Sequence, residues 1–399
     1  MLRRIAANLL LVVFGLVVGL AVAEAAVRML GLGRPGFFVY NRATGWSLRP
    51  GASGWQSEEG RAWVAINNAG MRDREHALQK PPGTLRIAVL GDSFTEAQQV
   101  PQADTFCALL QPDLKNCPAL HGRTVETLNF GCDSYGTGQE LMTLRTQVWR
   151  YHPDVVVLAF CTGNDVRNDS AILEGDKCQP FFTLDDDELV PTGDFSNSAV
   201  FRAQCAARFD SQGSALLNLL GDVRSRLRAR YRMWRAAASA PHPMGSELGL
   251  DDTTYSPPAT PHWRDAWAVA EQEVAEINRE VKGHGARFLL VTLSNGIQVY
   301  PDAAVRAAYM QRMGVANLFY PEQRLAALGQ REGFEVLNLA PAMQQYADHS
   351  HTFLHGFSNT KMGFGHWNEA GHRLAAQLIA QRLCTILNEA QVKAASPAP

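Results

Sequence analysis

Hydrophobic and polar positions alternate along much of this chain in blocks that predict strands followed by helices. Short apolar, partly β-branched runs predict buried strands, and helical patterns lie between them. The five predicted strands are Leu85–Leu90, Val125–Phe130, Asp154–Phe160, Arg287–Leu293 and Glu335–Leu339. Strands that alternate with helices form parallel sheets covered on both faces. The pattern therefore predicts an α/β fold, a flavodoxin-like three-layer α/β/α sandwich with a five-stranded parallel sheet.

The chain opens with a long apolar run from Ile5 to Ala23, broken only by one asparagine and two glycines. Its length suits a membrane span, and the arginine pair before it places the N-terminus in the cytoplasm. We expect residues 1–33 to form a single-pass inner-membrane anchor, with the rest of the chain on the periplasmic side. A cleavable signal peptide remains an alternative because Ala21-Val22-Ala23 has a small-x-small pattern. A buried core helix is the third.

Composition divides the rest of the chain. Residues 34–82 are rich in Gly, Pro, Trp and Asn, which predicts an extended accessory segment without recognisable chemistry. Residues 83–390 carry the α/β pattern, with an insertion at about 170–262 that is too long for one crossover. We interpret the insertion as a lid followed by a loop. The tail 391–399 is expected to be disordered.

One helical stripe lies inside the insertion. Its apolar members are Leu216, Leu220, Val223, Leu227, Tyr231 and Trp234, whereas the arginines between positions 224 and 235 lie mostly off it. This pattern favours a surface helix that packs on the domain and keeps its arginine face in solvent. The alternative is a basic amphipathic helix resting on anionic lipid or facing an anionic polymer.

Charge and cysteine content narrow the function classes. The 399 residues are 46% hydrophobic and 19% charged with a net charge of −2, so nothing indicates a nucleic-acid partner. The seven cysteines leave at least one unpaired, and disulfides are expected in an exported protein. Proximity in the sequence suggests the pairs Cys107–Cys117 and Cys178–Cys205, although spacing alone does not fix the connectivity.

The first predicted strand ends in Gly91-Asp92-Ser93, and residues able to begin a helix follow. This predicts a buried strand, a tight turn and a helix start. Ser93 would then stand at the carboxyl edge of the sheet, where open α/β folds bind ligands, with its N–H near a helix N-terminus. The position suits a nucleophile. From this stretch alone, an ordinary N-cap serine is the alternative.

Other predicted strands end in groups that suit acyl transfer. Gly131 follows the second strand and Asn164 the third, so both are expected on the same edge as Ser93. A backbone N–H and a side-chain amide there can stabilise an oxyanion. His366 is the candidate base, because it precedes the last predicted helix, with Asn368 as N-cap, where a neutral imidazole is preferred. We expect His372, inside that helix, to be structural.

These segments together resemble the SGNH, or GDSL, hydrolase superfamily. The resemblance rests on Gly91-Asp92-Ser93, Gly131, Gly163-Asn164-Asp165 and the segment beginning at His366, in the family's order over roughly residues 64–385. It implies that Ser93 is the nucleophile and His366 the base. The implied oxyanion hole consists of Ser93 N–H, Gly131 N–H and the Asn164 side chain. More narrowly, the chain looks like the membrane-anchored bacterial members.

One family feature is missing. Members usually place an orienting aspartate two or three residues before the catalytic histidine, where this chain has Phe364 and Gly363. Three alternatives follow: a backbone carbonyl orients His366, a distant acid such as Asp348 reaches it, or the protein is catalytically weak. The chain also lacks the second glycine of the Gly-x-Ser-x-Gly elbow, which disfavours the α/β-hydrolases.

No cofactor or metal is expected. Several histidines crowd one segment but lack the spacing of a zinc site; they are His349, His351, His355, His366 and His372. Cys132 and Cys161 both adjoin the predicted site. In the family's strand order the first strand separates theirs, so we expect no bond between them.

The sequence thus predicts a serine esterase that removes a small acyl group, O-acetyl above others, from a cell-envelope carbohydrate or lipid through an acyl-enzyme. An O-acyltransferase acting on an exopolysaccharide or envelope glycan is the first alternative, since transfer differs from hydrolysis only in the acceptor. A non-catalytic carbohydrate-binding or assembly protein is the second, motivated by the missing aspartate.

Overall fold

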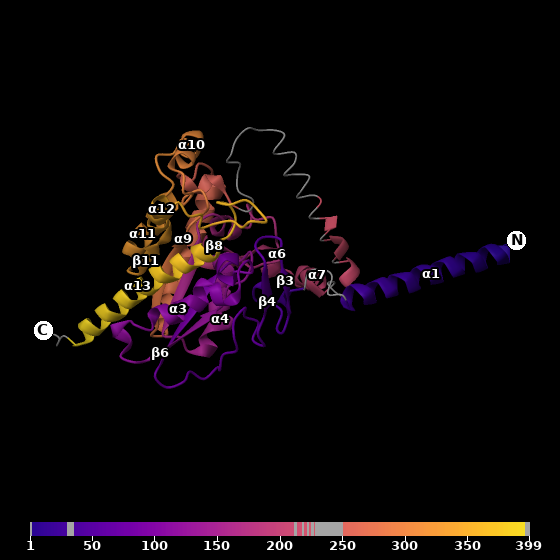
Figure 1. The fold of residues 1–399 in the computed structure, drawn as a ribbon, viewed down its shortest axis with the longest axis horizontal. Helices are drawn as coiled ribbons and strands as arrows, with labels where there is room; N and C mark the ends of the chain where they lie inside the picture. The colour runs from indigo at the N-terminus through magenta and orange to yellow at the C-terminus, as the bar shows by residue number, and fades with distance from the viewer. Residues whose placement is uncertain are drawn as a thin grey trace.

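The computed structural model describes residues 2–29, 36–210, 214–217, 219–221, 223, 224, 227 and 250–395. Five strands, all parallel, form the central sheet in the order β11-β10-β7-β5-β6 (Figure 1). They are β5 (Thr84–Gly91), β6 (Thr124–Asn129), β7 (Val155–Cys161), β10 (Arg287–Leu293) and β11 (Glu335–Asn338). The predicted α/β fold is confirmed, and each strand lies within one residue of its predicted bounds.

Helices cover both faces of this sheet. Side chains alternate along β5, so Ile87 and Val89 enter one apolar cluster while Ala88 and Leu90 enter the other. The first cluster is closed by α3 (Phe106–Leu114), α12 (Leu339–Ser350) and α13 (Glu369–Ala395). The second is closed by α4 (Thr137–Thr146), α9 (Pro261–Gly283) and α11 (Tyr320–Glu332). Three further helices follow strands at the carboxyl edge: α2 (Ser93–Glu96), α5 (Asp165–Asn168) and α10 (Ala303–Met313).

The accessory segment forms two antiparallel hairpins beside the sheet. They are β1 (Phe38–Asn41) with β2 (Gly45–Leu48), and β3 (Ser53–Gln56) with β4 (Ala62–Ala65). The insertion supplies β8 (Phe181–Asp185), β9 (Glu188–Thr192), α6 (Gly193–Asn197) and α7 (Ala199–Asp210). Trp46, Val64 and Phe209 share one apolar cluster. Both hairpins and α7 are therefore packed together as one wall.

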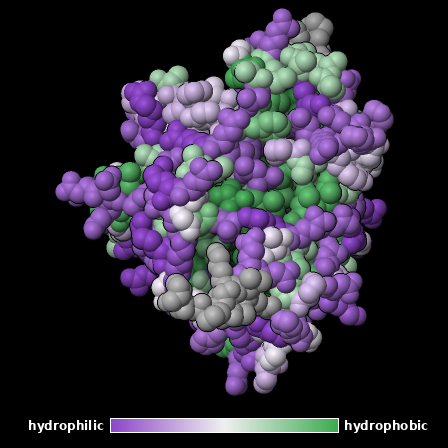
Figure 2. Space-filling model, turned by 90° about the vertical axis from the view of Figure 1, so that its left-hand side faces the viewer, coloured by the Kyte–Doolittle hydropathy of each residue, from purple (hydrophilic) through white to green (hydrophobic). Residues whose placement is uncertain are grey.

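Helix α1 (Leu2–Met29) extends away from the body (Figure 1). Its segment Ala7–Met29 has a mean hydropathy of 2.6 and is long and apolar enough to cross a membrane. The opposite end of the molecule is mostly hydrophilic, with apolar side chains gathered across its middle (Figure 2).

The expectation that the apolar stripe of the insertion packs on the domain is wrong for three of its four described members, whereas Leu216 is partly buried. Leu220, Val223 and Leu227 are helical and exposed. Tyr231 and Trp234 lie outside the described residues. The helix begins beside α1, where Glu24 accepts hydrogen bonds from the N–H groups of the first helical residues.

Two disulfides cross-link the body. Cys178–Cys205 is confirmed, but Cys117 pairs with Cys384 instead of Cys107. The reason is tertiary, since α13 lies along α3 and brings its cysteine to the end of that helix. Cys132 and Cys161 are buried and not bonded to each other, as expected, because β5 separates β6 from β7.

Candidate active site

Ser93 lies at the sharp turn between β5 and α2. Asp92 is the N-cap residue, and its Oδ1 accepts a hydrogen bond from Phe94 N–H at 2.9 Å, so Ser93 is the first helical residue and the alternative of an N-cap serine is wrong. The turn requires Gly91, because a Cβ there would come within 2.1 Å of Thr95 Oγ1. Ser93 is thereby held at the carboxyl edge of the sheet.

His366 approaches this serine from the loop before α13. Its Nε2 lies 2.8 Å from Ser93 Oγ, within hydrogen-bond distance. The loop is fixed because Asn368 Oδ1 accepts hydrogen bonds from the N–H groups of Ala370 and Gly371, which confirms Asn368 as the N-cap of α13. The structure therefore brings together the two residues predicted as nucleophile and base.

A carboxylate that the sequence did not indicate completes the arrangement. Glu59, in the turn of the hairpin β3–β4, places Oε2 2.5 Å from His366 Nδ1. Its other oxygen, Oε1, accepts a hydrogen bond from the His366 backbone N–H at 2.8 Å. The accessory segment, expected to carry no chemistry, thus supplies the acid of a Ser-His-Glu arrangement.

The position of Glu59 is fixed by the segment that precedes His366. Asn359 accepts a hydrogen bond from Gly60 N–H and donates to the carbonyl oxygens of Ser57 and Gly60. Gly365 has a φ of +80°, and a Cβ on it would come within 1.9 Å of Glu59 Oε1. Glycine at 365 therefore lets the carboxylate approach the backbone N–H of His366.

Electrostatics couples Glu59 to His366. Burial lowers the pKa of His366, but the hydrogen bond and the charge of Glu59 outweigh burial, and the net pKa is raised above 6.5. Burial raises the pKa of Glu59, yet its contacts with His366 leave it below the usual 4.5. The expectation of an imidazole kept neutral by the helix N-terminus is therefore wrong. The carboxylate favours the imidazolium, the form that arises when the base accepts a proton.

This pKa predicts the pH dependence of ester hydrolysis. A base acts only when neutral, so kcat/KM for p-nitrophenyl acetate should rise with pH to a plateau, with a midpoint above 6.5. In Glu59→Gln the carboxylate is gone while burial remains, so the midpoint should move to lower pH. The pH profiles of the two proteins test this, and a wild-type midpoint below 6.5 would contradict it.

The other acid and histidine candidates lie elsewhere. Asp348 forms a bidentate ion pair with Arg306, and the carboxylate at His366 is that of Glu59, so the alternative in which Asp348 reaches His366 is wrong. His355 is buried between Ser294 and the carbonyl of Gly365, and burial lowers its pKa to about 4. His372 accepts a hydrogen bond from the N–H of Phe106 at the start of α3, as expected of a structural residue.

The structure places one of the two further oxyanion candidates at the serine. Asn164 lines the pocket of Ser93, and its Nδ2 lies 3.4 Å from Asp92 Oδ2. The prediction that Gly131 N–H belongs to the oxyanion hole is corrected, because this N–H donates to Asn129 Oδ1 at 2.9 Å. A Cβ at Gly131 would collide with the backbone of α2, so its role is close packing. The neighbouring Ser134 lines the pocket in the left-handed conformation, with φ of +63°.

Ser93 and His366 open into a pocket of about 390 Å³. Its walls come from the sheet edge, the accessory hairpin and the insertion. The lining includes the aromatic side chains of Phe38, Trp46 and Phe209, together with Arg167, Arg208 and several amide and carboxylate groups. Arg208 is paired with Asp176, whose segment is joined to α7 by the Cys178–Cys205 disulfide. Apolar walls with a few oriented polar groups are typical of small-molecule sites.

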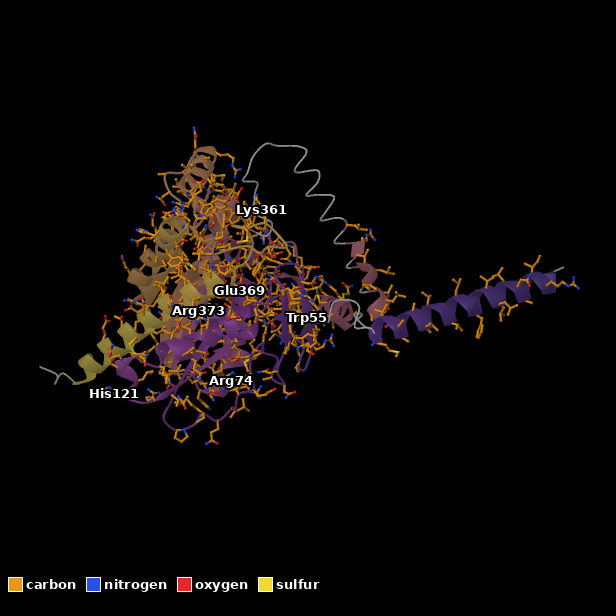
Figure 3. The ribbon with its side chains drawn as sticks, viewed as in Figure 1. Trp55, Arg74, His121, Lys361, Glu369 and Arg373 are labelled. Carbon is orange, nitrogen blue, oxygen red and sulfur yellow. A yellow bond between two sulfur atoms is a disulfide. The ribbon has the colours of Figure 1, made fainter. Side chains whose placement is uncertain are left out.

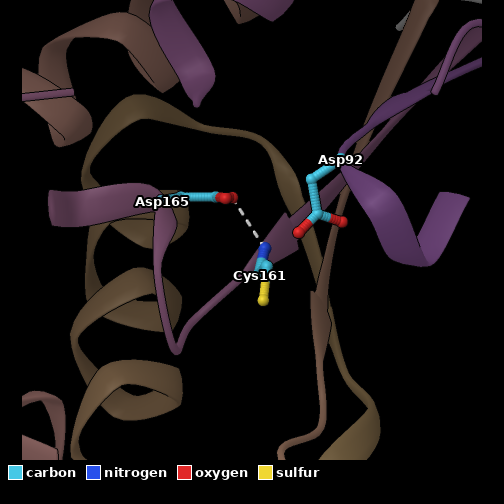
Figure 4. A group of neighbouring side chains, drawn as sticks. All are labelled: Asp92, Cys161 and Asp165. Atoms are coloured by element: carbon cyan, nitrogen blue, oxygen red, sulfur yellow. Dashed lines mark hydrogen bonds between the residues drawn. The ribbon is translucent and has the colours of Figure 1, made fainter. Parts of the chain in front are cut away.

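Among the described residues, one group has metal-ligand spacing. It consists of Asp92, Cys161 and Asp165, buried behind the serine, with ligand atoms within 4.8 Å of one another (Figure 4). Burial raises the pKa of Asp92 to about 6 and raises those of Cys161 and Asp165 well above their usual values. Metal ligands of these types bind when deprotonated.

Comparisons with known proteins give structural matches alone. No family model matches the sequence, and no curated protein matches it. Solved structures that match over most of their own length include an acetyl xylan esterase (12% identity, 75% of this chain, 100% of that chain, TM-score 0.38). A lipase/acylhydrolase from Enterococcus faecalis shares 14% identity over 76% of this chain and 96% of its own, with a TM-score of 0.37. A mutant acetylxylan esterase from Geobacillus stearothermophilus shares 10% sequence identity over 75% of this chain and 94% of its own, with a TM-score of 0.38.

Proposed function

We propose that this protein is a serine esterase that removes a small acyl group, O-acetyl above others, from a cell-envelope carbohydrate or lipid. The observation that carries the proposal is the chain of contacts from Ser93 Oγ through His366 to Glu59, with Ser93 and His366 lining a pocket. A hydroxyl, a base and an orienting carboxylate in this order are the parts of nucleophilic ester cleavage.

Ser93 Oγ attacks the ester carbonyl carbon while His366 Nε2 accepts the hydroxyl proton. The C–O bond to the leaving alcohol then breaks, and the alkoxide takes the proton from the imidazolium. Water, deprotonated by His366, cleaves the acyl-serine and releases the carboxylic acid and free Ser93. Glu59 stabilises the imidazolium in both halves of the reaction.

Donors around Ser93 can hold the developing oxyanion. Ser93 N–H lies at the start of α2, and the Asn164 side chain lines the same pocket. In place of Gly131, whose N–H is already bonded, we assign the third donor to Ser134 N–H. Its left-handed backbone turns at the pocket wall, beside Ser93 and Asn164 in the lining.

Location is part of the same proposal. Helix α1 would anchor the chain in the inner membrane, with the basic N-terminus in the cytoplasm and the body in the periplasm. Two disulfides support an oxidising compartment. The aromatic and polar walls of the pocket support a carbohydrate ester as the substrate class. The alternative of a non-catalytic binding protein was based on the missing orienting acid. Because Glu59 supplies a carboxylate at His366, that basis no longer holds.

Acetylated oligosaccharides with unacetylated acceptors test the proposal in the full chain. We expect free acetate to appear in the amount of ester lost, measured by enzymatic acetate assay and mass spectrometry. Acetyl groups appearing on the acceptor would instead establish an O-acyltransferase, since the acyl-serine would then react with a sugar hydroxyl. If the folded protein leaves the acetylated oligosaccharide unchanged, the assignment as an enzyme of this class is overturned.

A further inference from the structure

The hairpin that carries Glu59 also carries an exposed aromatic pair. Trp55 and Trp63 face each other across β3 and β4, with ring centroids 5.7 Å apart. They are 56% and 51% exposed, and the guanidinium of Arg61 lies 5.1 Å from the Trp55 ring centre. The other face of the hairpin is buried through Val64. An exposed pair of large aromatic side chains beside an arginine is typical of an interaction surface.

A second apolar surface lies at the base of α1. Leu217, Leu220, Val223 and Leu227 are each roughly half exposed or more. Glu24, near the end of the apolar span, accepts hydrogen bonds from Ser214 Oγ and from the N–H groups of Ala215 and Leu216. The helix therefore starts at the level of Glu24, the first charge of α1 after its apolar run, where the lipid headgroups are expected.

The two surfaces lie on the same side of the body. The helical residues that follow Ser214 run across the direction of α1 and not along it (Figure 1). Trp55 lies at the end of the body nearest to α1 (Figure 3). A helix that lies across the span and exposes apolar side chains is typical of an interfacial helix. Tryptophan is likewise enriched at membrane interfaces.

The catalytic pocket is close to this side. Arg208 and Phe209 line the pocket, and five residues later Ser214 contacts Glu24 of α1. Five residues of chain span at most about 18 Å. The pocket wall formed by α7 is therefore within a short distance of the end of the membrane-spanning segment.

From these observations we infer that the exposed side chains of Trp55, Trp63, Leu217, Leu220, Val223 and Leu227 form a lipid-docking surface. Its partner is a bilayer with anionic headgroups, which match the exposed side chains of Arg61 and Arg224. The inference rests on the proposed function for its consequence, which is that the pocket takes esters presented at the membrane surface, such as acylated lipid-linked carbohydrates. Of the two interpretations of the insertion stripe, this inference favours contact with lipid over packing on the domain.

Tryptophan fluorescence tests the docking without using activity. The full chain is placed in phosphatidylcholine–phosphatidylglycerol nanodiscs whose acyl chains carry bromine, which quenches tryptophans near the bilayer. We expect quenching in the wild type and loss of most of it in Trp55→Phe/Trp63→Phe. Trp149→Phe, in the residues that lead into β7, is the matched control and should leave the quenched fraction unchanged. Equal quenching in the wild type and the double variant would overturn the docking surface.

Activity separates the docking surface from the proposed function. On an acetyl ester embedded in the nanodisc, Trp55→Ala/Trp63→Ala should lower turnover about tenfold, as expected for lost interfacial contacts. Turnover of soluble p-nitrophenyl acetate should stay unchanged, which also shows that the hairpin is folded. Leu220→Ser/Val223→Ser should give the same split without touching that hairpin. Equal losses on both esters would overturn the inference.

Two other outcomes are distinguishable. If the wild type hydrolyses neither ester, the proposed function fails, while bromine quenching still reports on docking. If the wild type hydrolyses p-nitrophenyl acetate but bromine does not quench Trp55 and Trp63, the docking surface fails and the esterase stands. A soluble acetylated oligosaccharide, added without a bilayer, serves as the further test. If it changes the fluorescence of Trp55 and Trp63, the aromatic pair binds glycan and the lipid partner is overturned.

Discussion

Replacing Glu59 with glutamine is expected to lower kcat for ester hydrolysis by about 10³–10⁴, with a much smaller change in KM. The carboxylate accepts the Nδ1 proton of His366 at 2.5 Å, which leaves Nε2 free to accept the proton of Ser93. A glutamine amide can present its NH₂ group to Nδ1 and so favour the opposite tautomer. Steady-state kinetics on p-nitrophenyl acetate measures the loss.

Two matched variants control for charge and for the hairpin. Glu58→Gln removes the neighbouring carboxylate in the same turn, and Asp348→Asn removes the acid that pairs with Arg306. Both should keep kcat near the wild-type value, because the carboxylate that accepts hydrogen bonds from His366 is that of Glu59. If Glu59→Gln kept wild-type activity, or Asp348→Asn lost it, the assignment of the orienting acid to Glu59 would be wrong.

Ser93→Ala is expected to lose labelling by a fluorophosphonate probe and to lower kcat by about 10⁶. The probe reacts with a serine hydroxyl whose proton a base accepts, and Ser93 Oγ is 2.8 Å from His366 Nε2. His366→Ala should lose as much, because the two groups act as a unit. The double variant should therefore be no slower than either single variant.

An exposed serine serves as the control for labelling. Ser350, at the end of α12, bonds only to the carbonyl of Tyr346 among the contacts that the structure records for its hydroxyl. Ser350→Ala should label and turn over like the wild type. Probe incorporation that survives Ser93→Ala would move the nucleophile to another residue and falsify the mechanism proposed above.

The sheet could be predicted from the sequence because its signal is local. Each buried strand is a short apolar run, and the residues after the strand ends fall on one edge by topology alone. Local sequence signals also placed Ser93 and His366, since a turn signal surrounds Ser93 and an N-capped helix follows His366. These signals were enough to propose the two residues as partners. The structure places them in hydrogen-bond contact.

Glu59 could not be predicted in this way. It is 307 residues from His366 and lies in a turn with no periodicity or motif. One retrospective signal exists in Gly365, which is required because its Cβ would occupy the space of the carboxylate. The oxyanion-hole role predicted for Gly131 was wrong for a related reason. A glycine after a strand can serve close packing as readily as it can expose its N–H.

The apolar stripe of the insertion shows a different limit. Leucines and valines spaced along a helix bury against whatever apolar material is adjacent, so protein core and lipid produce the same pattern. Leu220 and Val223 could be placed only once the neighbouring contacts were known, above all the capping of their helix by Glu24. Tertiary context, and not the stripe, decides between the two.

The separation of Glu59 from the sheet changes how related chains should be compared. Asn359 and Gly365 hold the acid by contacts that a search for an aspartate near the histidine does not register. A fragment that starts at β5 would keep the nucleophile and the base and still lack the third member. Alignments limited to the sheet would therefore classify an intact catalytic set as degenerate. The pair of a hairpin glutamate and a glycine before the histidine is the signature to seek instead.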